Sequence, residues 1–456
     1  MRNSQPPKFN ARVQQLVGRC AQRFSEVASS VSESEVGYEW PGERRSASEL
    51  DSLRIHAQKY FKTSALENKD FEISDYSRTV LYYAEKAYSK VVWSLPDDFD
   101  SYDRYVEAVM RLDWTSSPGI PYCFENSSNR DWLKFNGVCC DSFKLERLWH
   151  DVQLVLNGSL DTVLRVFIKQ EPHKTSKAKE GRWRLIMAAP LCVQVAWHML
   201  FDFQNDKEID QAYYIPSQQG MNLVGGGWKQ YRQQWLYNGL SVGLDKSAWD
   251  WTAPSWALNM DLEFRFRMGR GDRKDDWMRI ARMLYRGMFD SPLLVLSDGT
   301  RFRQVVPGIM KSGCVNTIST NSHMQFFIHV VVCMMSGLPV EPWPVCCGDD
   351  TLQHKKHTED LSHYARLGVI VKTVTEGLEF MGHDFTEVGP QPMYMAKHLK
   401  KMLYTSDEIL PDYFDSMARM YVHTRYYDIW EHLAQLNGTP LAMSREAYLT
   451  WYDYSV

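Results

Sequence analysis

Apolar residues recur at helical spacing along some stretches of the chain and alternate with polar residues along others. Such a pattern predicts a fold that mixes helices and strands. Helices are predicted within residues 11–28, 46–90, 252–268, 316–336, 361–367, 412–427 and 444–452. Strands are predicted over residues 164–168, 183–187, 241–245 and 369–373, with hairpins over 343–352 and 378–385. The pattern therefore places helices and strands along the whole chain.

The helix predicted over residues 316–336 has a polar stripe in otherwise apolar surroundings. Thr317, Asn321 and Gln325 recur at four-residue spacing and share one face, while apolar residues such as Phe326 face elsewhere. Buried polar side chains need hydrogen-bond partners. The strength of the apolar face favours a helix covered on both sides over an ordinary amphipathic helix at the surface.

Two adjacent carboxylates lie at the tip of the hairpin predicted over residues 343–352. Gly348 is followed by Asp349 and Asp350, and an apolar run ends at Cys347. Two carboxylates about 4 Å apart repel by roughly 4 kcal/mol near a protein surface. Such a pair is tolerated if it is solvated, shares a proton or holds a metal ion. A solvated turn remains an alternative, because Gly-Asp-Asp would occur by chance in about one chain in ten of this length.

Another pair of carboxylates follows the strand predicted over residues 241–245. Asp245 ends that strand and Asp250 lies in the turn that follows, before a helix start signalled by Thr252 and Pro254. A capping carboxylate followed by a turn carboxylate would produce the same pattern.

Two stretches in the first half of the chain suit contacts with phosphate. Residues 165–184 hold seven Lys and Arg against two Glu, on and between two predicted strands. Such a hairpin is usually a solvated face, but strand alternation brings several of these charges to one side, as a phosphate or triphosphate site requires. Residues 115–121, Thr-Ser-Ser-Pro-Gly-Ile-Pro, form a rigid loop. It is either a plain connector or a guide for a phosphate backbone.

The composition of the chain excludes some classes of protein but does not identify its function. The chain has 456 residues, of which 44% are hydrophobic and 24% charged, so wholesale disorder is excluded. A net charge of −4 excludes an evenly basic surface but not a basic channel. The nine Cys include no C-x-x-C pair, which favours reduced thiols over a disulfide framework or a structural zinc site. No apolar run has the length of a membrane span or a secretory signal, so we expect a soluble cytoplasmic protein.

Taken in order, these motifs resemble those of the RNA-dependent RNA polymerases of positive-strand RNA viruses, over residues 110–400. Asp245-Lys-Ser-Ala-Trp-Asp250 resembles motif A, and Ser312-Gly-Cys-Val-Asn-Thr317-Ile-Ser-Thr-Asn321 resembles motif B. Gly348-Asp349-Asp350 resembles motif C, Lys372 the motif D lysine, and Phe380-Met-Gly-His383 stands where motif E falls. Residues 169–184 resemble motif F and 115–121 motif G. The wording Phe167-Ile-Lys-Gln-Glu-Pro-His-Lys174 is most similar to the sobemovirus and polerovirus group.

The resemblance implies phosphoryl transfer to an RNA 3′-hydroxyl with two Mg²⁺ ions, for which Mn²⁺ is a possible substitute. It implies metal binding by Asp245, Asp349 and Asp350, with Lys372 as general acid. It implies nucleotide binding by Lys169, Lys177, Arg182, Arg184, Asp250, Ser312, Thr317 and Asn321. Asp250 and Asn321 would recognise the ribose 2′-hydroxyl. Template contacts are expected at Ser116, Ser117, Gly119, Lys174 and Gly313.

The resemblance also implies a right-hand α+β fold with an antiparallel palm sheet flanked by helices. Residues 1–110 would form an N-terminal extension and part of the fingers, 111–239 the fingers, and 240–267 the first part of the palm. Residues 268–306 would form a fingers insertion, 307–390 the rest of the palm, and 391–456 the thumb.

Two alternatives stay open. A reverse transcriptase shares the motif A and C carboxylates, and an inactive RNA-binding scaffold could share the fold. Expected partners are single-stranded RNA template, nascent RNA and ribonucleoside triphosphates, with other viral replication proteins. The mode of initiation stays open: RNA synthesis could start from a genome-linked protein primer, de novo, or by back-priming. We expect the host cytoplasm, in replication complexes held at membranes through partners.

Overall fold

The computed structural model describes residues 7–25, 27, 37–43, 48–64 and 71–454. Its centre is a four-stranded antiparallel sheet in the order β10-β11-β6-β12. The strands are β6 (Leu240–Lys246), β10 (Val345–Cys347), β11 (Asp350–His354) and β12 (Val371–Glu376). In register, Leu244 of the central strand lies opposite Thr351 on one side and Val374 on the other. Segments more than a hundred residues apart in sequence thus meet in the palm.

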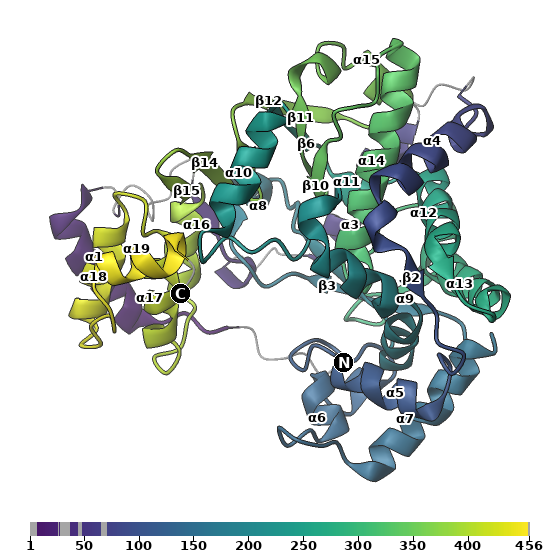
Figure 1. Ribbon diagram of the computed structural model, residues 1–456. Helices are drawn as coiled ribbons and strands as arrows, with labels where there is room; N and C mark the ends of the chain where they lie inside the picture. The colour runs from purple at the N-terminus through teal and green to yellow at the C-terminus, as the bar shows by residue number, and fades with distance from the viewer. Residues whose placement is uncertain (1–6, 26, 28–36, 44–47, 65–70, 455–456) are drawn as a thin grey trace.

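The longest of the palm helices is almost entirely buried. Helix α14 (Thr317–Ser336) packs against β10, α12 (Ser255–Met268) and α4 (Ser74–Ala87) (Figure 1). Its run from Ser319 to Cys333 is buried without a break, so the helix is covered on both sides, as its strong apolar pattern predicts.

A second four-stranded sheet, in the order β5-β3-β8-β9, lies in the residues expected as the fingers, which are called the fingers below. Its strands are β3 (Val163–Ile168), β5 (Leu185–Ala188), β8 (Leu293–Val295) and β9 (Arg301–Arg303). Strands β8 and β9 come from the segment expected as a fingers insertion, and β8 pairs in parallel with β3. The fingers helices are α5 (Tyr102–Met110), α6 (Asn129–Leu133), α7 (Ser142–Leu156), α8 (Thr175–Lys179), α9 (Leu191–Asp210) and α13 (Lys274–Phe289).

The thumb has a hydrophobic core of its own. Leu399, Phe414 and Trp430 are fully buried there together with Val13 and Cys20 from the other end of the chain. Its helices are α16 (Met395–Met402), α17 (Leu410–Met420), α18 (Tyr427–Leu436) and α19 (Arg445–Asp453), joined by α1 (Ala11–Arg23). Figure 1 shows the purple α1 beside the yellow α18. The N-terminal helix therefore packs with residues 391–456, the segment expected as the thumb.

The segment after α1 links the thumb to the fingers. Strand β1 (Tyr38–Glu39) pairs with β4 (His173–Lys174) of the basic hairpin. Trp40 stacks on Tyr404 of the thumb, with ring centroids 4.2 Å apart, and its indole donates to Gln170 of the fingers. The remaining elements are α3 (Glu49–Ser64), α10 (Gly227–Tyr237), α11 (Trp249–Thr252), α15 (Ser362–Arg366), β2 (Trp93–Ser94), β7 (Gly269–Arg270), β13 (Glu379–Phe380), β14 (His383–Thr386) and β15 (Gly389–Pro392).

Three predicted helix boundaries are wrong. The helix predicted over residues 412–427 is two helices, α17 and α18, because the chain turns between Tyr421 and Tyr426. The helix expected from Thr252 begins at Ser255, because Pro254 is extended and separates it from α11. Helix α1 ends at Arg23, where Phe24 becomes extended. Part of the predicted tail to residue 28 lies outside the described residues.

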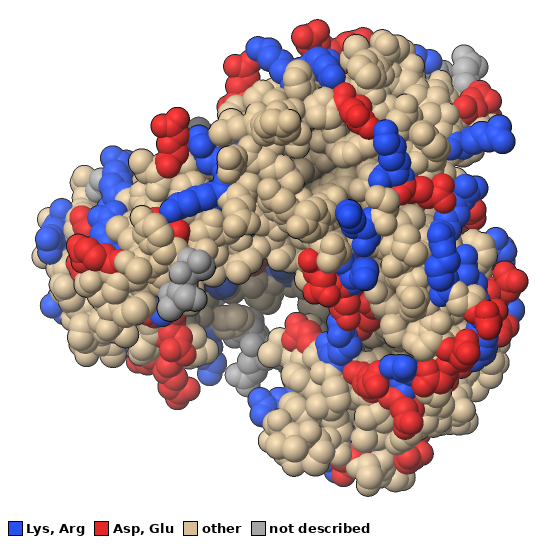
Figure 2. Space-filling model, viewed as in Figure 1, with Lys and Arg blue, Asp and Glu red and all other residues tan. Residues whose placement is uncertain are grey.

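The surface carries no large patch of one charge on the face in Figure 2. Lys and Arg are interspersed there with Asp and Glu around the rim of the view, including the thumb on the left, and the molecule is hollowed between thumb and fingers. This agrees with a net charge of −4. Among the described residues, no helix is long and apolar enough to cross a membrane.

Candidate active site

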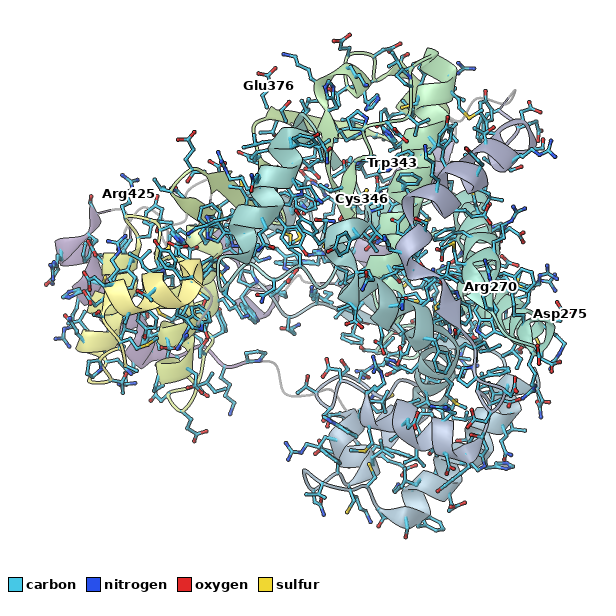
Figure 3. All side chains as sticks on the ribbon, viewed as in Figure 1. Arg270, Asp275, Trp343, Cys346, Glu376 and Arg425 are labelled. Carbon is cyan, nitrogen blue, oxygen red and sulfur yellow. The ribbon has the colours of Figure 1, made fainter. Side chains whose placement is uncertain are left out.

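The palm sheet brings the predicted aspartates to one end. Asp245 lies near the end of β6, one residue beyond the Leu244–Thr351 pair, so the antiparallel register sets it opposite Asp350. Asp350 begins β11, and Asp349 lies in the two-residue turn after Cys347. The hairpin is therefore confirmed. Cys346 on β10 lies in the interior, whereas Glu376 at the far end of β12 lies at the edge of the molecule (Figure 3).

The electrostatics of the turn favour the entry of positive charge. Burial and repulsion from Asp349 raise the pKa of Asp350 to about 6. Burial also raises the pKa of Asp349, and the charge of Asp245 adds to this. Lys372 compensates from outside, because its ammonium lies 2.7 Å from the Asp245 carboxylate.

A buried lysine stabilises the aspartates from behind. Lys246 is 4% exposed, and its ammonium donates to the Thr351 hydroxyl at 2.7 Å. Burial lowers the pKa of this lysine to about 8, although the charges of Asp349 and Asp350 oppose the shift. Lys246 was not singled out from the sequence. Strand alternation was the available signal, because it turns the Lys246 side chain to the face of the sheet opposite Asp245.

The sugar-recognition pair predicted from the sequence comes together in the structure. The Asn321 amide donates to the Asp250 carboxylate at 3.4 Å, and its carbonyl oxygen accepts from the Trp249 indole at 2.9 Å. Burial and the charge of Asp349 raise the pKa of Asp250 to about 6, while Arg184 and the Asn321 hydrogen bond act in the opposite direction. Asp250 thus feels charges from the palm and from the fingers.

The loop before α14 is built around internal hydrogen bonds. Thr317 donates to the carbonyls of Lys311 and Cys314, and Ser312 donates to the Leu185 carbonyl at 3.0 Å. The buried Lys311 ammonium donates to the Gln304 side chain at 2.6 Å, and burial lowers its pKa to about 7. Lys311 was not singled out from the sequence.

Two glycines of the predicted template contacts allow close backbone approach. A Cβ on Gly313 would overlap the Met187 carbonyl, and a Cβ on Gly119 would overlap the Ala189 carbonyl. Gly119 also has φ +65°, which favours glycine. The loops of motifs B and G therefore pack against the same strand end, around residues 187–190.

The hairpin turn is tied to α14 by a serine that sequence reasoning missed. The Gly348 amide donates to the Ser322 hydroxyl at 2.9 Å, and that hydroxyl donates to the Ile318 carbonyl one turn earlier. Ser322 directly follows Asn321, which is the only sequence signal. The position of the two carboxylates is thus coupled to the helix that carries Asn321.

The basic hairpin reaches the same region. The Glu171 carboxylate forms salt bridges with Arg184 at 3.0 Å and Lys169 at 3.3 Å, and the ammonium of Lys397 in the thumb lies 3.9 Å from it. The charges of Arg184 and Lys169 both act on Asp250. Burial lowers the pKa of Lys177, with further lowering by its basic neighbours. These cations form a cluster facing the carboxylates.

The other basic residues of the hairpin point to different partners. Arg182 pairs with Glu180 at 2.9 Å, and its charge acts on Lys177. Lys174 is exposed and lies opposite Tyr38 in the short β1–β4 pair. A contact of Lys174 with template stays a prediction.

The hydroxyls of the 115–121 loop are used within the fold. Ser116 donates to Asp113 at 2.8 Å, and Ser117 accepts from the Arg165 guanidinium at 3.0 Å. The Pro118 carbonyl accepts from the Leu191 amide at the start of α9. The loop is therefore a rigid structure, and its contact with a template stays a prediction.

The donor chemistry of the three aspartates fits a divalent cation. Carboxylate oxygens are hard ligands, and burial together with repulsion from neighbouring carboxylates raises the pKa of Asp349 and Asp350, a cost that a bound cation would relieve. In the described part of the chain, the three do not bring one oxygen each within 4.8 Å of one another. They form an open edge rather than a closed cage, and Asp245 and Asp350 line a cleft of about 190 Å³ beside it. Mg²⁺ commonly binds such an edge together with water and substrate phosphates.

Comparison with known proteins gives a family and a fold. The sequence model of the family "Viral RNA-dependent RNA polymerase" matches residues 74–358. Replicase polyprotein P2AB of Southern bean mosaic virus is 32% identical over 376 residues, 74% of this chain and 37% of that protein. Protein P1-P2 of Pea enation mosaic virus-1 is 30% identical over 400 residues, 80% of this chain and 32% of that protein. Protein P1-P2 of Potato leafroll virus (strain Potato/Scotland/strain 1/1984) is 28% identical over 419 residues, 84% of this chain and 38% of that protein.

This chain therefore spans less than two fifths of the length of these relatives. Among solved structures, the Sicinivirus 3Dpol RNA dependent RNA polymerase superposes with a TM-score of 0.63 at 18% identity. That match covers 82% of this chain and 84% of the other. At this identity it supports the fold, a right hand with fingers, palm and thumb.

Proposed function

Because this chain belongs to the family of viral RNA-dependent RNA polymerases, we propose that it extends RNA by template-directed transfer of ribonucleotides to a 3′-hydroxyl. The relatives from Southern bean mosaic virus and Potato leafroll virus agree with the resemblance to the sobemovirus and polerovirus group. The observation that carries the proposal is the convergence of Asp245, Asp349 and Asp350 at one end of the palm sheet, facing the cations of the basic hairpin.

In the proposed mechanism, Asp245 and Asp349 would be the principal ligands of two Mg²⁺ ions, or of Mn²⁺ as a substitute, and Asp350 would assist. When bound, the ions would supply charge neutralisation to the reacting oxygens. Lys246 keeps the carboxylates close together by balancing part of their charge from the buried side.

The incoming nucleotide is bound from two sides. Arg184, Lys169 and Lys177 bind its triphosphate, with Arg182 beside them. Asp250 accepts a hydrogen bond from the ribose 2′-hydroxyl, and Asn321 orients the Asp250 carboxylate. Ser312 and Thr317 support this pair through the loop that they brace.

Lys372 acts as the general acid for the departing pyrophosphate. Its ammonium lies on the Asp245 carboxylate, and its charge acts on Lys177 of the basic hairpin, so it lies between the carboxylates and the triphosphate site. Ser116, Ser117, Gly119, Lys174 and Gly313 line the template path in this proposal.

The direct experiment supplies purified chain with a primed RNA template, Mg²⁺ and either ribonucleotides or deoxynucleotides. We expect products complementary to the template from ribonucleotides. Preferred incorporation of deoxynucleotides would favour a reverse transcriptase. RNA binding without any product would favour an inactive scaffold.

A further inference from the structure

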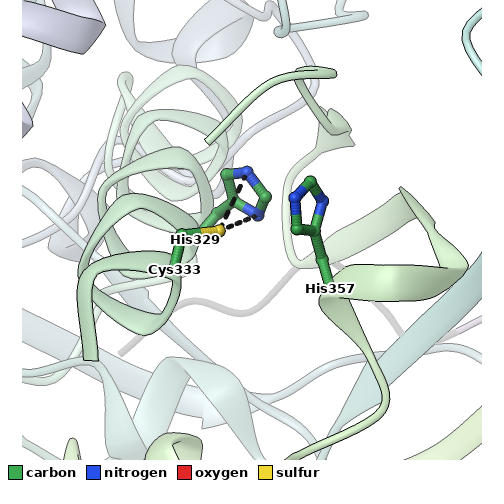
Figure 4. Close-up of side chains that lie close together, drawn as sticks. All are labelled: His329, Cys333 and His357. Carbon is green, nitrogen blue, oxygen red and sulfur yellow. Dashed lines mark hydrogen bonds between the residues drawn. The ribbon is translucent and has the colours of Figure 1, made fainter. Parts of the chain in front are cut away.

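A second cluster of metal-ligand side chains lies inside the palm, away from the aspartates. His329 and Cys333 are one helical turn apart on α14, and His357 faces them from the short 3-10 helix at residues 355–357 (Figure 4). Their exposed fractions are 2%, 1% and 3%. One donor atom from each lies within 4.8 Å of the others. The cluster is therefore buried and compact, and its residues come from two elements.

The hydrogen bonds of the two imidazoles fix their tautomers. Nε2 of His329 lies 2.9 Å from the Val340 carbonyl, and Nε2 of His357 lies 2.8 Å from the Pro339 carbonyl. A carbonyl oxygen only accepts, so each Nε2 carries hydrogen. In a neutral ring, Nδ1 then carries a lone pair that can accept a hydrogen bond or bind a metal ion.

The two Nδ1 atoms differ in their surroundings. Nδ1 of His357 is buried and has no hydrogen-bond partner. Nδ1 of His329 lies 3.9 Å from the Cys333 sulfur and 3.3 Å from the Gln353 amide nitrogen. A buried acceptor without a partner costs about 1–3 kcal/mol. A ligand between the three side chains would remove that cost.

This arrangement has the outer contacts of a metal site. A histidine that binds a metal usually donates its other ring N–H to a carbonyl or carboxylate, which orients the ring. One thiolate with two imidazoles is a donor set typical of zinc. Zn–N and Zn–S bonds of about 2.0–2.3 Å separate tetrahedral ligands by roughly 3.5 Å, so the side chains must close in by about 1 Å.

We propose that His329, Cys333 and His357 bind one structural Zn²⁺ ion. A water or the Gln353 side chain, with its amide turned to present oxygen, fills the fourth position. Binding converts the Cys333 thiol to a thiolate and releases its proton to solvent. Because the ligand must lose this proton, zinc binding weakens as the pH falls.

The ion would link α14, the helix of motif B, to the segment that follows β11 of motif C. His329 and Cys333 belong to α14, which carries Asn321 and Ser322, and His357 follows β11. Gln353 also connects the cluster to Thr351, whose hydroxyl contacts Lys246 behind the aspartates. Zinc would therefore stabilise the support of the catalytic end without touching substrate.

Metal analysis tests the proposal without RNA or nucleotide. Protein refolded with Zn²⁺ and then dialysed is expected to retain about one zinc per chain, the stoichiometry of a structural site. Cys333→Ser and His357→Ala should fall to background. Cys20→Ser, which alters a buried thiol of the thumb core, and Asp349→Asn, which removes a proposed Mg²⁺ ligand, should keep their zinc.

A spectroscopic measurement guards against variants that fail to fold. Co²⁺ bound to the unmodified chain should give thiolate charge-transfer absorption that Zn²⁺ abolishes and that Cys20→Ser retains. Unmodified, folded chain without zinc and without this absorption would overturn the proposal. Zinc retained in full by folded Cys333→Ser would also overturn it.

Discussion

Asp250 shows how one carboxylate connects the two halves of the site. Burial and Asp349 raise its pKa to about 6, whereas Arg184 and the amide of Asn321 stabilise its charged form. The carboxylate is therefore sensitive both to the charge on the palm and to the charge on the fingers. A bound triphosphate would alter the second, which makes Asp250 suited to sensing a nucleotide.

Replacing Asp250 with Ala should relax discrimination against deoxynucleotides. The lost hydrogen bond from the 2′-hydroxyl to a charged acceptor corresponds to about 1.5–3 kcal/mol, or roughly 10- to 100-fold in the ratio of ribonucleotide to deoxynucleotide kcat/KM. The control is Asp275→Ala on the surface helix α13 (Figure 3), which should leave the ratio unchanged. An unaltered ratio in Asp250→Ala would remove the sugar-sensing role.

At the scale of elements, α14 is the part on which the others are assembled. Its His323 lies between Asp261 of α12 and Glu208 of α9, each at 2.6 Å, and all three are buried. Arg265, Tyr285 and Thr320 also donate hydrogen bonds to the Asp261 carboxylate. Breaking a buried ion pair by removing one partner costs about 3–5 kcal/mol, so this cluster fixes the helix in place.

The cluster predicts a pH dependence of stability. Burial lowers the pKa of His323, but Glu208 and Asp261 outweigh it and raise the pKa above 6.5. A raised pKa contributes stability that is complete below the unfolded value of about 6.5 and is lost as the pH rises through the folded value. The free energy of unfolding should therefore decline above neutral pH.

Urea denaturation across pH 6–9 measures this decline. His323→Gln should be less stable near pH 6 and should lack the decline, whereas exposed His150→Gln should behave as the parent. Asp261, a carboxylate partner of His323, affects the free energy of unfolding at acid pH instead. Arg265 and His323 lower the pKa of Asp261 despite its burial, so its contribution is lost only in acid, as the pH falls below about 3.9. A flat profile in the parent from pH 6 to 9 would contradict the role of His323.

The loop before α14 supplies another prediction at this scale. A methyl on Gly313 would overlap the Met187 carbonyl, so Gly313→Ala should displace the loop from β5. A displacement of about 1 Å in a site of this kind costs roughly 100-fold in rate. Primer-extension rates should show this loss, while Gly18→Ala, which meets nothing within 4 Å on α1, should extend normally. Equal rates would mean that the loop tolerates displacement.

The elements and motifs were predictable to different degrees from the sequence. The hairpin at Asp349, the strand at Asp245 and the helix from Thr317 were predicted because period and turn chemistry are local signals. Lys246 and Ser322 were missed, because alternation and helical period give a face but not the group packed against it. The break between α17 and α18 was missed because aromatic residues continue through the turn.

The histidine and cysteine cluster was not foreseen for a similar reason. Because the chain contains no C-x-x-C pair, its sequence favours reduced thiols over a structural zinc site. In the structure, His329 and Cys333 are one turn apart on a helix, and His357 reaches them only because β11 returns the chain to that helix. Spacing rules for zinc ligands describe short loops, and they do not detect a site assembled by the fold.

At the scale of the whole molecule, the site exists only where palm and fingers meet. The carboxylates come from residues 245–350 and the triphosphate cations from residues 169–184. The N-terminal segment holds this arrangement from outside, since α1 belongs to the thumb core and β1 pairs with the basic hairpin. Lys397 of the thumb contacts Glu171 at 3.9 Å, a second link between thumb and fingers.

Trp40 tests this linkage. Its ring stacks on Tyr404 of the thumb and its indole donates to Gln170 of the fingers, while only 3% of the residue is exposed. Trp40→Ala should lower the free energy of unfolding by about 3–5 kcal/mol and shorten the products made per binding event. The control is Tyr82→Ala, because Tyr82 is 60% exposed on α4. Unchanged product length at lower stability would confine Trp40 to a structural role.

Single-nucleotide extension of a primed RNA by Asp245→Asn and Asp349→Asn, beside the parent, tests the catalytic metal site most directly. Each variant keeps the size of the side chain and removes one negative metal ligand. Both should bind the RNA as the parent does and lose at least about 1,000-fold in extension rate, because several kcal/mol of transition-state stabilisation depends on the bound ions. Extension at the parental rate by either variant, with folding and RNA binding intact, would contradict the assignment of these carboxylates as the catalytic metal site.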